Sequence, residues 1–109
     1  MKLFTFFSAA VVLSALSACT LQKSNDPFSP TSQMAKSANK PIADLGKGYG
    51  IFMRQCSQCH DKRIPNQIPT KEWHKIVPGM AWNAGLSVEE RRLVTDYIVA
   101  ASKTKTPVN

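Results

Sequence analysis

The hydrophobic pattern divides the chain into three parts. After a lysine at position 2, residues 3–18 form an apolar run without a charged residue. Residues 19–42 are rich in Ser, Asn, Pro, Lys and Thr and offer few positions that could bury a face. From about residue 43, apolar residues return at helical spacing. Because 109 residues suffice for one small domain, the pattern predicts a single folded domain over residues 43–109.

The clearest helix prediction lies near the C-terminus. Ser87 and Glu90 have the spacing of a capping box, in which each side chain bonds the other residue's backbone N–H. One apolar stripe follows at helical spacing: Leu93, Val94, Tyr97, Ile98 and Ala101.

Two further helices are expected upstream. A short one should start at Pro69 or Thr70 and end at Pro78–Gly79, because a Pro-Gly pair marks a turn. Another should precede Cys56, although Gly46 and Gly50 leave its start open. No strand-like run occurs in this part of the sequence, so the fold class is predicted to be all-α.

The apolar run at the N-terminus indicates export. It is shorter than the roughly 20 residues of a membrane-spanning helix and suits the apolar region of a secretory signal. It ends in Leu-Ser-Ala-Cys, residues 16–19, which resembles the lipobox of bacterial lipoproteins. The resemblance implies that residues 1–18 are removed, that Cys19 carries the lipid, and that the chain is anchored to a bacterial membrane facing the periplasm. Thr20 favours the outer membrane, because that family's inner-membrane signal is an Asp at this position; the alternative is an ordinary signal peptide cut near Ala18.

The polar stretch 19–42 is predicted to be a flexible, lipid-tethered linker. Phe28 and Met34 are isolated within it, and no special role is expected for them. Such a linker would give the domain a reach on the order of 25 Å.

The motif Cys-x-x-Cys-His at residues 56–60 carries the candidate chemistry. A structural zinc site usually takes four ligands from two separated pairs, but His74 is the only other histidine and His60 directly follows Cys59. A thioredoxin-like dithiol expects a βαβ context. A disulfide between the two cysteines would close a very short loop and stabilise little.

The same motif is the attachment signature of a c-type haem. Cys56 and Cys59 would fall on neighbouring helical turns and form thioethers to one porphyrin, and His60 would be the proximal iron ligand. A domain of about 60 residues forms a small core, which a large apolar cofactor would complete. The sequence therefore predicts one covalent haem c.

The flanking residues resemble those of small class I cytochromes c over roughly residues 44–102. In that family, a glycine eight residues and an aromatic four residues before the first cysteine pack against the C-terminal helix; here they are Gly48 and Phe52. The resemblance implies contacts of these two residues with Val94 and Tyr97, in a fold whose N- and C-terminal helices cross around the haem.

The sixth iron ligand follows from the same resemblance. Trp73 and Met80 match a Trp…Met pattern in which the methionine is the distal ligand, here expected on a turn just outside the short helix. His74 is the alternative ligand, and an open or water-bound site is the third possibility. Trp73 and Trp82 are expected at the haem edge, and the carbonyl of Pro65 or Pro69 is expected to orient His60.

The predicted function is one-electron transfer and not enzyme catalysis, because an iron with both axial positions filled has no free site for a substrate. A haem-based gas or redox sensor and a haem subunit of a larger periplasmic oxidoreductase complex are the alternatives. The formal net charge is +7. Five basic residues surround the haem-bearing segment: Arg54, Lys62, Arg63, Lys71 and Lys75. They form either an ordinary solvated face or a patch that steers an acidic redox partner. A monomer is expected, with no nucleic-acid partner.

Overall fold

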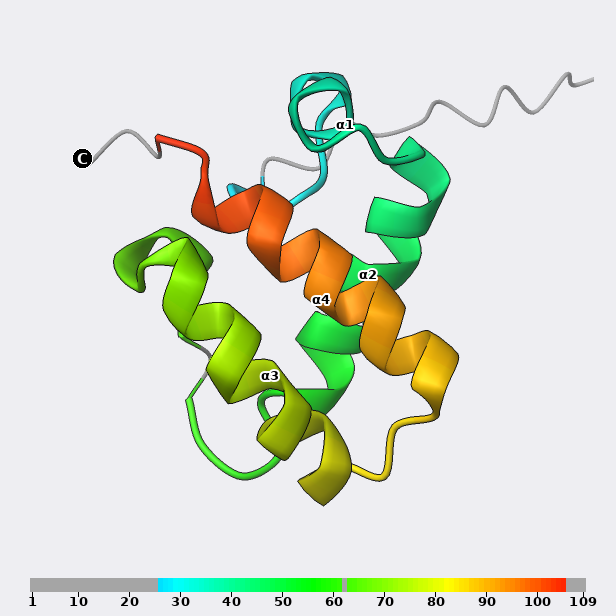
Figure 1. Ribbon diagram of the computed structural model, residues 1–109, viewed down its shortest axis with the longest axis vertical. Coiled ribbons are helices and arrows are strands. Elements are labelled where there is room, and N and C mark those ends of the chain that lie inside the picture. The colour runs from blue at the N-terminus through cyan, green and yellow to red at the C-terminus, as the bar shows by residue number, and fades with distance from the viewer. Residues whose placement is uncertain (1–25, 62, 106–109) are drawn as a thin grey trace, which may run out of the picture.

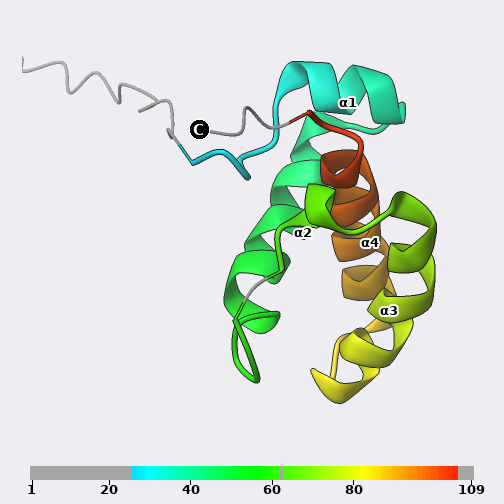
Figure 2. The ribbon, with the colours of Figure 1, turned by 90° about the vertical axis from the view of Figure 1, so that its left-hand side faces the viewer.

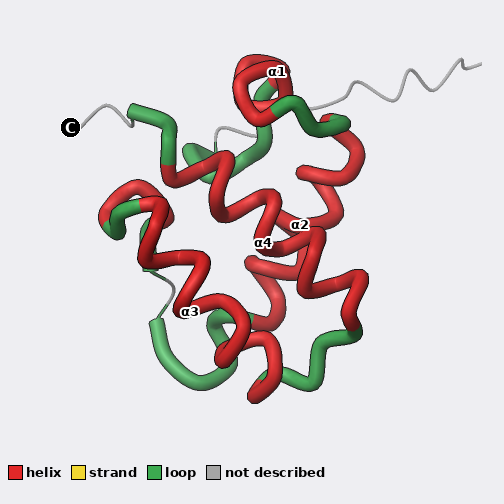
Figure 3. Tube along the Cα trace, in the orientation of Figure 1, coloured by secondary structure: helices red, strands yellow, loops and turns green. Residues whose placement is uncertain are grey.

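Four α-helices and one short 3₁₀ helix make up the computed structural model, which describes residues 26–61 and 63–105 (Figure 1). The α-helices are α1 (Ser32–Ala38), α2 (Ile42–Gln55), α3 (Thr70–Asn83) and α4 (Val88–Ser102), and η1 (Pro65–Gln67) precedes α3. Within the described residues there is no strand, which confirms the all-α prediction (Figure 3). The signal peptide, Cys19 and Lys62 lie outside these residues.

Helices α2 and α4 form the centre of the fold, and they cross at Gly48. A methyl group built on Gly48 would stand 2.8 Å from the Tyr97 β-carbon and 2.8 Å from the Leu93 carbonyl carbon. The ring centroids of Phe52 and Tyr97 are 5.5 Å apart. The expected contacts of Gly48 and Phe52 with Tyr97 are therefore confirmed, and the backbone of Leu93 is the second neighbour of Gly48.

Helix α4 begins as its sequence predicts. The Glu90 N–H donates to Ser87 Oγ at 3.2 Å, and the Ser87 N–H donates to Glu90 Oε2 at 2.9 Å. These bonds satisfy two of the N–H groups that a helix start leaves unpaired. All five residues of the predicted stripe, from Leu93 to Ala101, are buried in the core.

Helix α3 is longer than expected, because it continues through Pro78 and Gly79 to Asn83. A proline inside a helix removes one hydrogen bond and typically costs about 3 kcal/mol. Trp73, Val77 and Ala81 follow each other at intervals of four residues across this point, and all three are buried. Packing of this face against the core offsets the loss, so the prediction that the helix ends at Pro78–Gly79 is wrong.

The predicted flexible linker is wrong for its described part, residues 26–42. Thr31 caps α1 by accepting the Met34 N–H at 3.1 Å, and Met34 is buried in the core. The Tyr97 hydroxyl donates to the Phe28 carbonyl at 2.7 Å, and the Tyr49 hydroxyl donates to Asp26. A single buried methionine and two tyrosine hydroxyls thus hold this polar segment against the domain.

Helix α1 and the C-terminal end of α4 lie at one end of the molecule (Figure 2). The end of α2, the end of α3 and the loop into α4 lie at the opposite end (Figures 1 and 2). None of the helices in the described residues is long and apolar enough to cross a membrane.

Candidate cofactor site

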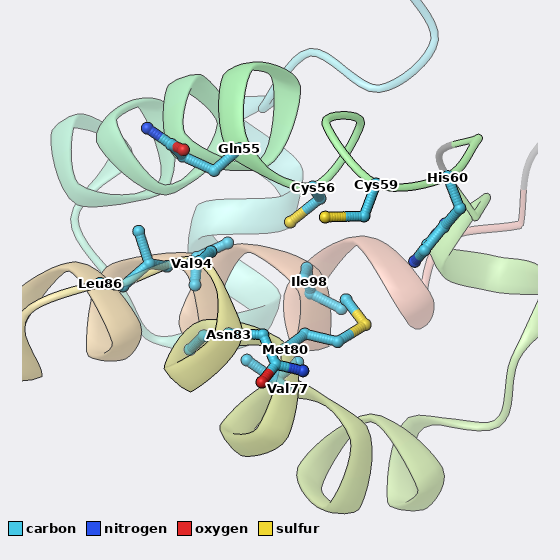
Figure 4. Close-up of a pocket in the computed structure, with 12 residues that line it drawn as sticks. Gln55, Cys56, Cys59, His60, Val77, Met80, Asn83, Leu86, Val94 and Ile98 are labelled. Carbon is cyan, nitrogen blue, oxygen red and sulfur yellow. The ribbon is translucent and has the colours of Figure 1, made fainter.

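A pocket opens between the end of α2, the C-terminal half of α3 and the core face of α4 (Figure 4). Its empty volume is about 590 Å³, including the open mouth. The lining residues are Gln55, Cys56, Cys59, His60, Val77, Met80, Ala81, Asn83, Ala84, Leu86, Val94 and Ile98.

The two cysteines predicted to attach the haem, Cys56 and Cys59, and the two residues preferred as iron ligands, His60 and Met80, all line this one pocket. In Figure 4, Cys56 and Cys59 come from the end of α2 and the turn after it, and Met80 comes from α3 on the opposite wall of the pocket. The imidazole of His60 faces the same space from the loop after Cys59. The fold therefore brings together residues that are up to 24 positions apart in the sequence.

The end of α2 fixes the cysteine pair. Cys56 is the C-cap of the helix, and its N–H still donates to the Phe52 carbonyl at 3.2 Å. The chain then tightens, since the Gln58 N–H donates back to Gln55 at 3.4 Å and Ser57 Oγ donates to the Met53 carbonyl at 3.2 Å. Cys59 consequently lies in a turn after the helix, which corrects the prediction that both cysteines sit on neighbouring helical turns.

The two thiols differ in their surroundings. Cys56 is half-buried, and burial raises the pKa of its thiol because a thiolate is poorly solvated there. Cys59 is exposed, and neither residue forms a disulfide. The neutral form of Cys56 suits a pocket whose remaining wall is mainly apolar, with Val77, Leu86 and Ile98 among its residues.

A backbone carbonyl sets the orientation of His60. Its Nδ1 atom lies 2.7 Å from the Asp61 carbonyl oxygen. A proton on Nδ1 that is donated to this oxygen leaves the Nε2 lone pair available for a metal, the arrangement usual for metal-bound histidines. The prediction that the carbonyl of Pro65 or Pro69 orients His60 is wrong, because the carbonyl bonded to the imidazole is that of Asp61. The Pro65 carbonyl instead accepts the Trp73 indole N–H at 2.7 Å.

Neither tryptophan lines the pocket, which corrects the prediction for both of them. Trp73 is only 1% exposed and ties α3 to η1 through its bond to Pro65. Trp82 is 83% exposed. Both lie on α3, and the face of the helix that packs on the core includes Trp73 and not Trp82.

Met80 and His74 both lie on α3, but only Met80 lines the pocket. Met80 belongs to α3 itself, not to a turn beyond it, and still reaches the pocket (Figure 4). His74 is exposed and does not line the pocket. The geometry therefore favours Met80 over His74 as a ligand from α3.

A zinc site and a thioredoxin-like dithiol find no support in the described part of the chain. No group of three or more His, Cys, Asp or Glu side chains comes together there as a metal site requires. The helical context also lacks the βαβ unit of a thioredoxin-like dithiol, within the same residues. By contrast, paired thiols, an imidazole, a thioether and apolar walls fit the chemistry of a c-type haem.

The charged residues are distributed unevenly around the bundle. On α2 and α4, Arg92 bonds Asp44, Glu89 and Asp96, and Lys40 also bonds Asp96. Among the basic residues expected near the cysteine motif, Lys75 pairs with Glu72 at 3.3 Å. Arg54, Arg63 and Lys71 are exposed and have no ion pair within residues 26–61 and 63–105.

In comparisons with known proteins, the chain matches no family model, no curated protein and no solved structure.

Proposed function

We propose that this chain is a membrane-tethered monohaem c-type cytochrome that carries single electrons between redox partners facing the periplasm. The observation that supports it most is the pocket shared by Cys56, Cys59, His60 and Met80. Besides these four side chains, the pocket has an apolar wall and an open mouth, which suit a flat apolar cofactor with one exposed edge.

In this proposal, the thiols of Cys56 and Cys59 would hold the haem covalently, and His60 and Met80 would ligate its iron. When bound, the haem supplies the one-electron redox chemistry. The chain contributes position, ligand identity and exclusion of water by Val77, Ile98 and the other apolar lining residues. A thioether ligand raises the reduction potential relative to a second imidazole.

The remaining parts of the proposal concern where the protein works. Cys19 anchors the exported chain by its lipid, and the outer membrane is the favoured location. The exposed basic residues Arg54, Arg63 and Lys71 favour an acidic redox protein as partner, because opposite charges speed diffusional encounter.

Production of the chain in bacteria with haem-maturation machinery tests the proposal. The purified protein, denatured and analysed by mass spectrometry, should retain the mass of one haem. Cys56→Ala and Cys59→Ala should each weaken the attachment, and the double variant should abolish it. Ser57→Ala, between the cysteines, is the matched control and should retain the haem. Wild-type protein that is exported and folded without covalent haem would refute the proposal.

The two alternative functions give different results in the same preparation. Rapid binding of carbon monoxide by the reduced protein would favour a gas sensor, because it requires a labile or absent sixth ligand. Co-purification with a large periplasmic enzyme at fixed stoichiometry would favour a subunit of an oxidoreductase complex.

A further inference from the structure

The end of the domain that is farthest from the pocket has its own groove. It lies between residues 27–37, which include most of α1, and residues 103–105, which follow α4. Figures 1 and 2 show these segments together at the α1 end, with the ends of α2 and α3 at the other. We call the surface formed by residues 27–37 and 103–105 the anchor-side face.

The chemistry of the anchor-side face suits phosphate groups. Lys103 and Lys105 line the groove, and Lys36 is exposed on α1 at the same end. Among the described residues, none of the three forms an ion pair. Ser29 and Ser37 add hydroxyl groups to the lining. Ammonium and hydroxyl donors of this kind bind phosphate oxygens well.

The course of the chain brings this face close to the proposed anchor. Asp26 is held to the domain, because its carboxylate accepts the Tyr49 hydroxyl and the Phe28 N–H, and Tyr97 holds the Phe28 carbonyl. Only residues 20–25 separate Cys19 from Asp26. Even fully extended, that stretch spans roughly 25 Å. A lipid on Cys19 would therefore keep the anchor-side face near the membrane.

We infer that the anchor-side face docks on an anionic phospholipid surface and that the pocket with Cys56, Cys59 and His60 faces the water. The inference rests on the proposed function for the tether. It identifies the partner class, because a redox protein must then approach from the aqueous side and not from within the anchoring membrane. Lysines close to an anionic membrane strengthen binding by roughly five-fold each.

Vesicle binding by a protein that lacks the lipid on Cys19 isolates the contribution of the anchor-side face. The haem-loaded chain from residue 19, carrying Cys19→Ser and produced behind an ordinary cleavable signal peptide, is sedimented with phosphatidylcholine vesicles. A second, separate vesicle preparation contains phosphatidylglycerol in addition and is therefore anionic. We expect binding only to the anionic vesicles, weakened by salt. Lys103→Gln with Lys105→Gln should reduce the affinity at least about five-fold.

The matched control removes two positive charges from the other end. Arg54→Gln with Arg91→Gln should change the affinity by less than about two-fold, since both arginines are exposed near the ends of α2 and α4 that face away from α1. Equal loss in the two double variants, a larger loss in the arginine variant, or no binding to anionic vesicles would overturn the inference. The absorption spectrum of each preparation reports haem independently, so failure of the proposed function is recognised separately.

Discussion

Gly48 on α2 lies directly against Tyr97 on α4, with space for a hydrogen atom but not for a methyl group. A β-carbon at position 48 would stand 2.8 Å from that of Tyr97, well inside normal contact. This close approach lets the two helices cross and brings the cysteine motif at the end of α2 over the core face of α4.

Gly48→Ala should therefore destabilise the protein by about 1–3 kcal/mol, the usual cost of overpacking a core. Gly46→Ala is the control on the same helix, since nothing lies within 4 Å of a methyl group there. It should stabilise the protein by up to about 1 kcal/mol, because alanine favours a helix more than glycine. Denaturant unfolding of the two variants measures both effects. Equal effects of the two substitutions would contradict the assigned helix crossing.

Trp73 and Trp82 should respond in opposite ways to substitution by phenylalanine. Trp73→Phe removes the indole N–H that the Pro65 carbonyl accepts at 2.7 Å and should destabilise the protein by about 1–3 kcal/mol. Trp82→Phe should change stability by less than about 0.5 kcal/mol, because the residue is 83% exposed. Thermal unfolding checks both values. A large effect at Trp82 would show that the outer face of α3 is covered.

The contact between Tyr49 and Asp26 makes stability depend on high pH. The hydrogen bond to Asp26, with burial and the carboxylate charge, raises the pKa of Tyr49 to about 12 from its usual 10. The unfolded chain loses this proton first, so the stabilisation is complete below pH 10 and is lost as the pH rises toward about 12. Burial also raises the pKa of Tyr97, which adds to the same trend.

Tyr49→Phe should flatten the decline in stability above pH 10 while leaving the rest of the profile similar in shape. The measurement is the free energy of unfolding of both proteins at several pH values from 8 to about 11.5. Hydrogen exchange at Phe28 should accelerate in the variant, because the Asp26 carboxylate that accepts this N–H loses its support from Tyr49. An unchanged profile would show that the N-terminal segment is not held by this bond.

Features with strong local signals could be predicted from the sequence. The capping box of Ser87 and Glu90 and the buried stripe of α4 depend on residues within one or two helical turns. The contact of Gly48 with Tyr97 could be predicted from the resemblance to small class I cytochromes c, because Gly48 and Phe52 stand eight and four residues before Cys56. The Cys-x-x-Cys-His motif and the Trp…Met pattern together singled out Cys56, Cys59, His60 and Met80, and these four residues line one pocket.

Packing between distant segments could not be predicted where no motif or family pattern indicates the contact. Residues 26–40 have one core residue, Met34, so their composition resembles a linker, and the tyrosines that hold them lie far along the chain. At Pro78, a local turn signal competes with burial of Val77 and Ala81 on either side, and burial decides the outcome. Once α3 continues, its buried face is fixed by Trp73, Val77 and Ala81, and Trp82 necessarily points elsewhere.

The absorption spectrum of the haem-loaded protein, oxidised and reduced, tests the central claim most directly when Met80→Ala and His74→Ala are measured beside it. The proposed ligation predicts a weak long-wavelength sulfur-to-iron band in the oxidised wild type. This band should disappear in Met80→Ala and persist in His74→Ala, whose side chain is exposed outside the pocket. A spectrum of two imidazole ligands that Met80→Ala leaves unchanged, or a high-spin wild-type spectrum, would contradict the account.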